Sequence, residues 1–368
     1  MIDCLIVGGG IIGLSAAYEL VRRGATVRII DDQRSQRTAS WAAAGILPPP
    51  ISRATHDAME QLRDMSHELY PGWCERLQQE SGIDVQFVRS GGIYVARRVG
   101  ETASLAAALQ QWQVDGVELH EIDTDWIQEH EPALNNSPPF RSAYLLPDES
   151  TVCPPKLLSA LQQCLQESGV QIDRDVRLHG WNRHQSRVES VSTSSGTISS
   201  GHICVATGPW SHETLFDLEI DLPVEPRRGQ MLMWEFDEPI IHRVINEGLR
   251  YLVPRPDGKL LAGSTVEDVG FDDQVTEAGL AELTQFANGL IPALEEHPPT
   301  RSWTGLRPFS RDGFPYLGRL PNYENVLVAT GHFRSGIHLA PATAQVIGDL
   351  LAGMPVECDL QAFAPTRT

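Results

Sequence analysis

The first thirty residues alternate between apolar runs and glycines in a pattern that predicts a β-α-β unit. A short apolar run from Leu5 to Val7 leads into a glycine-rich turn. Apolar residues then recur at helical spacing between Ala16 and Val21, and Gly24 ends the helix. Residues 26–30 restart the strand character. This unit predicts a parallel sheet at the start of the chain.

Helical and strand patterns continue to alternate after this unit. We expect helices over 54–80, 101–113, 155–167, 277–290 and 337–351, and strands over 91–96, 170–172, 188–197, 203–206, 231–234, 251–254, 260–263 and 326–329. Asp257-Gly258 lies between two of these strands and is a strong hairpin signal. Because antiparallel stretches interrupt the α/β pattern twice, we expect two interleaved domains.

The predicted fold class is α/β with an α+β second domain. A Rossmann-like, nucleotide-binding domain would comprise 1–85, 150–225 and 300–368. A mainly antiparallel β-sheet domain for the substrate would comprise 86–149 and 226–299.

Charge and cysteine content narrow the range of partners. The chain has 368 residues with 29 basic and 48 acidic side chains, a net charge of −19. Such a charge repels phosphate backbones and anionic lipid, so we do not expect nucleic acid or membrane surfaces as partners. Small molecules are the expected partners.

We also expect no signal peptide and no membrane span. The six cysteines form no CxxC pair, which favours reduced thiols and a cytoplasmic location.

The turn after the first strand carries the chemistry. Gly8, Gly10 and Gly13 form GxGxxG between a strand and a helix, where glycines allow a tight turn, close approach to a pyrophosphate, and close helix packing. Asp31 ends the second strand, where an acid can accept from ribose hydroxyls. The combination predicts a dinucleotide site.

Two later returns to a strand-glycine pattern favour FAD over NAD. They are Val205 to Trp210 and Val328 to Ile337, and the second feeds a helix N-terminus that can stabilise negative charge on a reduced flavin. An NAD-dependent dehydrogenase and a non-catalytic nucleotide-binding module remain alternatives.

Five segments in this order resemble the FAD-dependent D-amino-acid oxidase superfamily, and most closely its glycine oxidases of thiamine biosynthesis. They are Gly8–Gly13 with Asp31, Ser40–Leu47, Tyr251–Arg255, Thr304–Pro308 with Asp312–Gly318, and Gly331–Gly336. The resemblance covers nearly the whole chain. It implies a Rossmann-like FAD-binding domain.

The resemblance also implies the residues of the site. Arg307 and Tyr251 would bind the substrate carboxylate, because a guanidinium fork binds a carboxylate bidentately. Arg334 would be the third substrate-binding residue, close to the flavin and the pocket. From the residues alone, Arg307 could instead form a surface ion pair, and Tyr251 could be a core side chain. The implied FAD-binding residues are Gly8, Gly10, Ile11, Ile12, Gly13, Asp31, Asp32, Ser40, Ala43, Ala44, Gly45, Ile46, Leu47, Val176, Thr207, Gly208, Arg307, His332, Arg334, Ser335, Gly336 and Ile337.

The implied reaction is oxidation of glycine or a small D-amino acid. Hydride would pass from the α-carbon to FAD, O2 would reoxidise the flavin to give H2O2, and the imino acid would yield an oxo acid and ammonia or enter thiazole synthesis. No protein acid or base is obligatory. An FAD-linked amino-acid or sarcosine dehydrogenase that uses another electron acceptor is the alternative. The resemblance also implies that the chain can form a homo-oligomer.

The sequence departs from the glycine oxidase pattern at three positions. Leu249 stands where those enzymes have a histidine, and Ile46 and Val266 stand where they have methionines, which predicts a more apolar pocket. No cysteine lies between Pro308 and Asp312, so non-covalent FAD is expected. The acidic segments 267–273 and 120–131 match no metal-ligand spacing, and we expect solvated faces and no metal.

Overall fold

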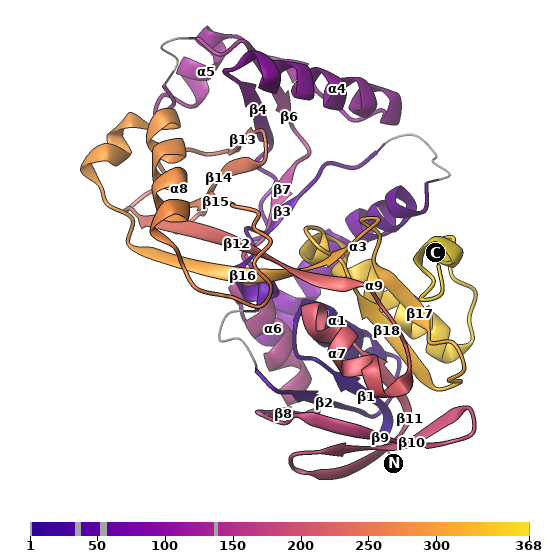
Figure 1. The fold of residues 1–368 in the computed structure, drawn as a ribbon. Coiled ribbons are helices and arrows are strands. Elements are labelled where there is room, and N and C mark those ends of the chain that lie inside the picture. The colour runs from indigo at the N-terminus through magenta and orange to yellow at the C-terminus, as the bar shows by residue number, and fades with distance from the viewer. Residues whose placement is uncertain (1, 34–37, 52–56, 136–138, 368) are drawn as a thin grey trace.

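The computed structural model describes residues 2–33, 38–51, 57–135 and 139–367. Two eight-stranded sheets dominate the fold and lie in separate lobes (Figure 1). The chain passes between the two sheets several times, which confirms the predicted fold class of a Rossmann-like unit interleaved with a mainly antiparallel sheet. The prediction that begins a helix at 54 falls partly outside the described residues.

The first sheet has a parallel centre and has the order β17-β18-β11-β1-β2-β8, with β10 and β9 extending from β11. Its strands are β1 (Ile2–Val7), β2 (Val27–Asp31), β8 (Gln171–Arg174), β9 (Leu178–His184), β10 (Arg187–Thr193), β11 (Gly196–Val205), β17 (Tyr316–Arg319) and β18 (Val326–Thr330). The carboxyl ends of β1, β2, β11 and β18 meet at one edge. Ligands of open α/β sheets bind at such an edge.

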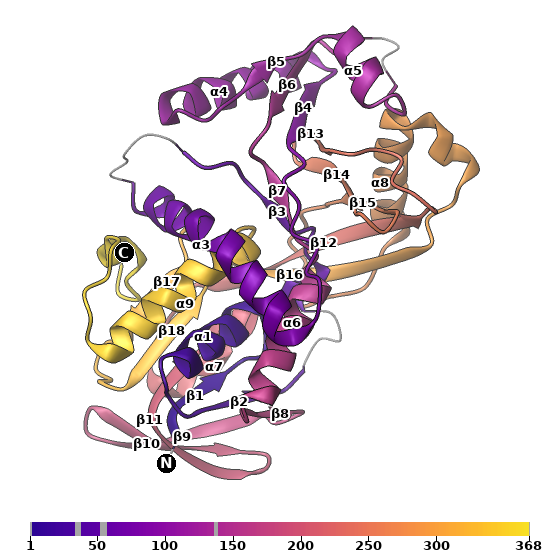
Figure 2. The ribbon, with the colours of Figure 1, turned by 180° about the vertical axis from the view of Figure 1, so that it is seen from behind.

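Four helices cover one face of this sheet (Figure 2). They are α1 (Ile11–Arg22), α3 (Ala58–Ser81), α6 (Pro154–Glu167) and α9 (Gly336–Ala352). Alternate residues of β1 divide between the two faces: Ile6 packs in the helical core and Leu5 in a second core on the opposite face. Local signals set the helix ends, since the Asp57 carboxylate accepts from Met59 N and Glu60 N, and Gly82 ends α3 in the left-handed conformation.

The second sheet has the order β16-β12-β15-β14-β13-β4-β6-β5, and only β13 and β4 pair in parallel. Its strands are β4 (Gly92–Ala96), β5 (His120–Glu121), β6 (Ser142–Leu146), β12 (Val224–Glu235), β13 (Val244–Glu247), β14 (Arg250–Pro254), β15 (Lys259–Gly263) and β16 (Arg301–Ser310). The Asp257-Gly258 hairpin joins β14 and β15 as predicted. The remaining helices are α2 (Ala39–Ala42), α4 (Val99–Asp115), α5 (Thr124–His130), α7 (Ser211–Leu215) and α8 (Glu277–Leu290), and β3 (Ile46–Leu47) pairs with β7 (Ser150–Thr151).

One boundary of the expected domain division does not follow the sheets. β16 pairs with β12 from Arg301 to Ser310, so this segment belongs to the second sheet although residues 300–368 were assigned to the nucleotide-binding domain. The division into domains itself stays a prediction.

The two faces of the second sheet have different partners. One face packs with Leu283 and Phe286 of α8 in an apolar core. The other face brings Met231 and Trp303 against Ala42 of α2, and the indole Nε1 of Trp303 donates to the Ala42 carbonyl at 3.1 Å. This second face therefore meets the ligand edge of the first sheet.

Candidate active site

The glycine turn after β1 is too crowded for side chains. Gly8 N donates to the Ile30 carbonyl at 2.8 Å, and Gly8 has a φ of +116°. A Cβ on Gly8 would lie 2.4 Å from the Ala206 carbonyl oxygen, and one on Gly13 would lie 2.0 Å from the Gly8 carbonyl oxygen. The turn, the helix and β11 therefore approach each other as closely as backbone allows.

The N-terminus of α1 is open to an anion. Gly10 is the N-cap and supplies no side-chain cap, and the first turn contains no acidic residue. The Ile11 N–H donates to the Ser40 hydroxyl at 3.0 Å. A helix N-terminus with these properties favours a phosphate group through its N–H groups and its dipole.

Asp31 lies at the end of β2, beside this turn. Its carboxylate accepts from Gln33 N at 3.1 Å, and a Cβ on Gly9 would lie 2.4 Å from Asp31 Oδ2. Burial raises the pKa of Asp31, partly offset by the backbone hydrogen bonds it accepts. Asp31 thus offers a fixed acceptor at the edge where a ribose would lie.

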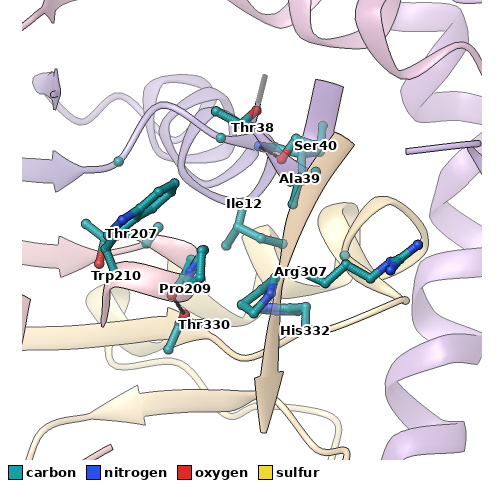
Figure 3. Close-up of a pocket in the computed structure, with 18 of the residues that line it drawn as sticks. Ile12, Thr38, Ala39, Ser40, Thr207, Pro209, Trp210, Arg307, Thr330 and His332 are labelled. Carbon is teal, nitrogen blue, oxygen red and sulfur yellow. Dashed lines mark hydrogen bonds between the residues drawn. The ribbon is translucent and has the colours of Figure 1, made fainter. Parts of the chain in front are cut away.

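A cavity of about 510 Å³ runs from this turn to the second sheet. In Figure 3, Thr38, Ala39 and Ser40 lie on one side of it, and Thr330 and His332 on the other. Of the residues implied by the resemblance, the following line it: Gly8, Gly10, Ile11, Ile12, Asp31, Asp32, Ser40, Ala43, Ala44, Gly45, Ile46, Val176, Thr207, Gly208, Tyr251, Arg307, His332, Arg334, Ser335, Gly336 and Ile337. Gly13 and Leu47 do not; Gly13 packs the helix, and Leu47 lies in the core.

Several lining residues were not predicted. They are Gly9, Thr38, Ala39, Ala42, Pro48, Leu178, His179, Pro209, Trp210, Gly229, Met231, Gly305, Phe333 and His338, among others. Gly9 lies inside the glycine motif and Pro209 and Trp210 follow Gly208, so the motifs could have indicated them. Gly229 and Gly305 pair across β12 and β16, a relation that only the register shows.

Arg307 is held in the cavity by neutral groups. Its Nη2 donates to the Ser264 hydroxyl at 2.6 Å and its Nη1 to the Thr265 carbonyl at 3.2 Å. Within the described residues it forms no ion pair, so the alternative of a surface ion pair does not describe it. Burial lowers the pKa of Arg307, with Tyr251 opposing this shift, but a guanidinium keeps its charge. A charge of this kind is suited to an anionic ligand.

Tyr251 and Arg334 complete the group of side chains expected to bind the substrate. The Tyr251 hydroxyl contacts Met231 Sδ at 3.6 Å, a weak acceptor that a ligand can replace. Arg334 is exposed at the rim, and its Nη2 donates to the Leu249 carbonyl at 3.2 Å. Leu249 and Val266 are themselves exposed and do not line the cavity, so of the three departures only Ile46 makes it more apolar.

His332 is a buried lining residue that stays neutral. Its Nε2 lies 3.1 Å from the Thr343 hydroxyl, and burial lowers its pKa to about 3. A histidine with this pKa does not become a cation at neutral pH. It therefore adds no charge to the cavity.

The acidic segments 267–273 and 120–131 form ion pairs with arginines, whereas we expected them to be solvated faces. The Glu267 and Asp272 carboxylates pair with buried Arg228 at 2.6 and 2.7 Å, and buried Glu131 pairs with Arg243 at 3.0 Å. Sequence spacing could not show these pairs because their partners lie far away along the chain: Arg228 is on β12, and Arg243 directly precedes β13. In the described part of the chain, no group of three His, Cys, Asp or Glu residues is placed to hold a metal ion.

The chain belongs to the family described as FAD dependent oxidoreductase (DAO), whose sequence profile matches residues 3–350. It is thus an FAD-dependent oxidoreductase, as the resemblance implied. It is 33% identical to the glycine oxidase of Pseudomonas aeruginosa over 362 residues, 98% of each chain. It is also 33% identical to the bifunctional protein ThiO/ThiG of Trichormus variabilis over 378 residues, 99% of this chain and 55% of that one. The structure of glycine oxidase from Geobacillus kaustophilus superposes with a TM-score of 0.92 at 29% identity, covering 100% and 98% of the chains.

The residues present fit FAD. The glycine turn presents backbone without side chains to the cavity, and the α1 N-terminus and Asp31 suit a pyrophosphate and a ribose. The N-terminus of α9 also lines the cavity, with no side-chain cap on Ser335 and no acid in its first turn. None of the helices in the described ranges has the length and apolar character of a membrane span.

Proposed function

We propose that this chain is an FAD-dependent amino-acid oxidase that converts glycine or a small D-amino acid, with O2 and water, to an oxo acid, ammonia and H2O2. The observation that carries the proposal is Arg307, a half-buried cation in the cavity whose guanidinium donates to the neutral groups of Ser264 and Thr265. The likeness to glycine oxidases supports the choice of substrate class.

Arg307 would bind the substrate carboxylate through the face of its guanidinium that Ser264 and Thr265 leave free. A bidentate, charge-assisted pair of this kind fixes direction as well as position. The Tyr251 hydroxyl would turn from Met231 Sδ to donate to the same carboxylate. Both side chains approach from the second sheet, so the α-carbon would face the first sheet, where the cofactor is expected.

FAD, when bound, supplies the acceptor for the hydride that leaves the α-carbon. The chain's own contribution is orientation. Among the described lining residues, His332 and His338 are held neutral by burial, with pKa values lowered to about 3, so neither of these two adds a positive charge near the amine. When the amine of the substrate is neutral, the hydride can leave the α-carbon with no protein base, because the nitrogen lone pair forms the C=N bond.

Apolar side chains next to the proposed carboxylate site favour a small substrate without a charged side chain. Met231 Sδ lies 3.6 Å from the Tyr251 hydroxyl, and Ile46 lines the same cavity. Consumption of the imino acid in thiazole synthesis is a finer proposal, supported by the likeness to a ThiO/ThiG protein, and a cytoplasmic location and a homo-oligomer also remain proposals.

A substrate panel tests the proposal. The purified, FAD-loaded chain is mixed with glycine, sarcosine and several D-amino acids, and peroxide is measured. We expect peroxide with glycine or a small D-amino acid. Strong dye reduction with little peroxide would instead identify a dehydrogenase with another acceptor. If neither peroxide formation nor dye reduction is detected with any substrate, the proposal is contradicted, and a non-catalytic nucleotide-binding module is the remaining interpretation.

Arg307→Ala gives the matched test of the site. It should abolish turnover and leave the flavin bound, because the cofactor's phosphates and ribose are bound at the other end of the cavity. Unaltered turnover in this variant would refute the role of Arg307.

A further inference from the structure

The groups that hold Arg307 lie on the connection between β15 and α8, residues 264–276. Ser264 offers its hydroxyl and Thr265 its carbonyl to the guanidinium, and both residues are buried. Neither residue belongs to a helix or a strand. The position of the Thr265 carbonyl therefore depends on side chains that bind this connection.

The Glu267 carboxylate binds the connection at the Thr265 hydroxyl. Thr265 Oγ1 donates to Glu267 Oε1 at 2.5 Å and accepts from the Gln230 N–H at 2.9 Å. Gln230 Nε2 donates to the same carboxylate oxygen at 2.8 Å. Thr265 is thus bound at two points, because its carbonyl receives Arg307 and its hydroxyl is fixed by Glu267 and Gln230.

Arg228 of β12 fixes the Glu267 carboxylate in turn. Arg228 is only 3% exposed, and its Nη2 donates to Glu267 Oε2 at 2.6 Å. The backbone N–H of each residue also donates to the carbonyl of the other, at 3.0 and 2.9 Å. Burial acts to raise the pKa of Glu267, but the hydrogen bonds from Arg228, Thr265 and Gln230 outweigh it, and the pKa lies below its ordinary value. The carboxylate is therefore ionised at neutral pH.

This arrangement keeps the charge of Glu267 away from the guanidinium of Arg307. Within the described ranges, the ion pair of Glu267 is with Arg228 and not with Arg307. A carboxylate of the chain that bound Arg307 would compete with a substrate carboxylate for the same N–H groups. Glu267 can therefore order the connection and leave Arg307 available to a ligand.

We propose that Glu267 is a positioning residue for substrate binding: through the Thr265 hydroxyl it fixes the Thr265 carbonyl, and thereby the direction in which Arg307 presents its guanidinium to a carboxylate. The inference rests on the proposed function, in which Arg307 binds the substrate. A guanidinium that donates to fixed acceptors keeps its remaining N–H groups in one orientation, and a bidentate pair needs that orientation.

The first test compares Thr265→Val with Thr265→Ser in FAD-loaded protein, with acetate as the probe of the carboxylate site. Valine has the shape of threonine and lacks the hydroxyl, so the bond to Glu267 is lost and the Kd of acetate should rise roughly three- to tenfold. KM for the amino acid should rise by a similar factor, with a smaller change in kcat and none in FAD affinity. Serine keeps the hydroxyl and should restore the acetate affinity of the parent.

Glu267→Gln is the second variant, and it decides the matter if Thr265→Val does not fold. The amide NH2 of glutamine would face the Arg228 guanidinium at one position or Gln230 Nε2 at the other. Gln230 cannot turn its amide to adapt, because its Oε1 accepts from Thr276 N at 2.9 Å. We expect the Kd of acetate to rise at least as much as in Thr265→Val.

Thr193→Val is the matched control, since it removes a hydroxyl in a similar setting that does not line the cavity. The Thr193 hydroxyl donates to the Gly196 carbonyl at 2.7 Å and accepts from Ser195 N at 3.2 Å, at the hairpin between β10 and β11. This variant should lower the free energy of unfolding and leave the Kd of acetate unchanged. A weaker affinity for acetate here as well would overturn the inference, because any loss of stability would then have the same effect.

Arg307→Ala separates this inference from the proposed function. If Arg307→Ala loses acetate while Thr265→Val and Glu267→Gln bind it as tightly as the parent, the inference is overturned and the role of Arg307 stands. If Arg307→Ala binds acetate as tightly as the parent, the proposed function fails and the inference fails with it.

Discussion

Replacing Gly229 by alanine should disable substrate binding without removing the cofactor. A Cβ on Gly229 would lie 2.2 Å from Arg307 Nη1 and 2.3 Å from Nη2. Ordinary contact begins at 3.4 Å, so the guanidinium must move by about 1.2 Å. That movement breaks or strains its hydrogen bonds to the Ser264 hydroxyl and the Thr265 carbonyl. The strand itself survives because the end of a flexible side chain gives way.

A misplacement of about 1 Å in a positioning group costs on the order of 100-fold, or about 2.7 kcal/mol. We therefore expect the Kd of acetate, the analogue of glycine that lacks the amine, to rise roughly 100-fold in Gly229→Ala. The assay follows the visible flavin spectrum as acetate is added to the FAD-loaded protein. KM for the amino acid should rise in parallel, while FAD affinity should stay close to that of the parent.

Gly100→Ala is the control, since a Cβ on Gly100 meets nothing within 4 Å. It should leave acetate binding unchanged. If Gly229→Ala binds acetate as tightly as the parent, the carboxylate does not depend on the position of Arg307, and the reasoning is refuted.

Three further variants test other parts of the structure. Gly8→Ala should lose FAD on gel filtration, because its Cβ would meet the fixed Ala206 carbonyl oxygen at 2.4 Å and its φ is +116°; retained FAD would contradict this. Burial raises the pKa of Glu149 from 4.5 to about 7, so the folded state holds a proton that the unfolded chain has lost, and stability should fall by roughly 3 kcal/mol as pH rises across this interval. Urea unfolding at about pH 5 and about pH 8 should show this fall in the parent and not in Glu149→Gln. Arg255→Met should lower the free energy of unfolding by about 2–4 kcal/mol, because it leaves the Val152 and Ala44 carbonyls unpaired; an unchanged denaturation midpoint would refute this.

Local signals predicted most of the helices and strands, and they drew attention to the glycine turn that lines the cavity. The strand-glycine-helix pattern from Leu5 to Gly13 depends only on neighbouring residues, and the helix expected over 277–290 is observed with those bounds. The resemblance placed Arg307 and Tyr251 on the cavity because both lie within short motifs.

What the sequence could not show depends on contacts between distant segments. Gly229 has no room for a side chain because β12 pairs with β16 in a register that brings Arg307 over it. The same pairing places 301–310 in the second sheet, against the expected boundary.

Anaerobic reduction of the bound flavin tests the central claim most directly. FAD-loaded protein is mixed with glycine or a small D-amino acid in the absence of oxygen, and the visible flavin absorbance is followed. The account predicts bleaching in the parent, no bleaching in Arg307→Ala, and peroxide when oxygen is admitted. A flavin that no amino acid bleaches, or one bleached equally well in Arg307→Ala, would contradict it.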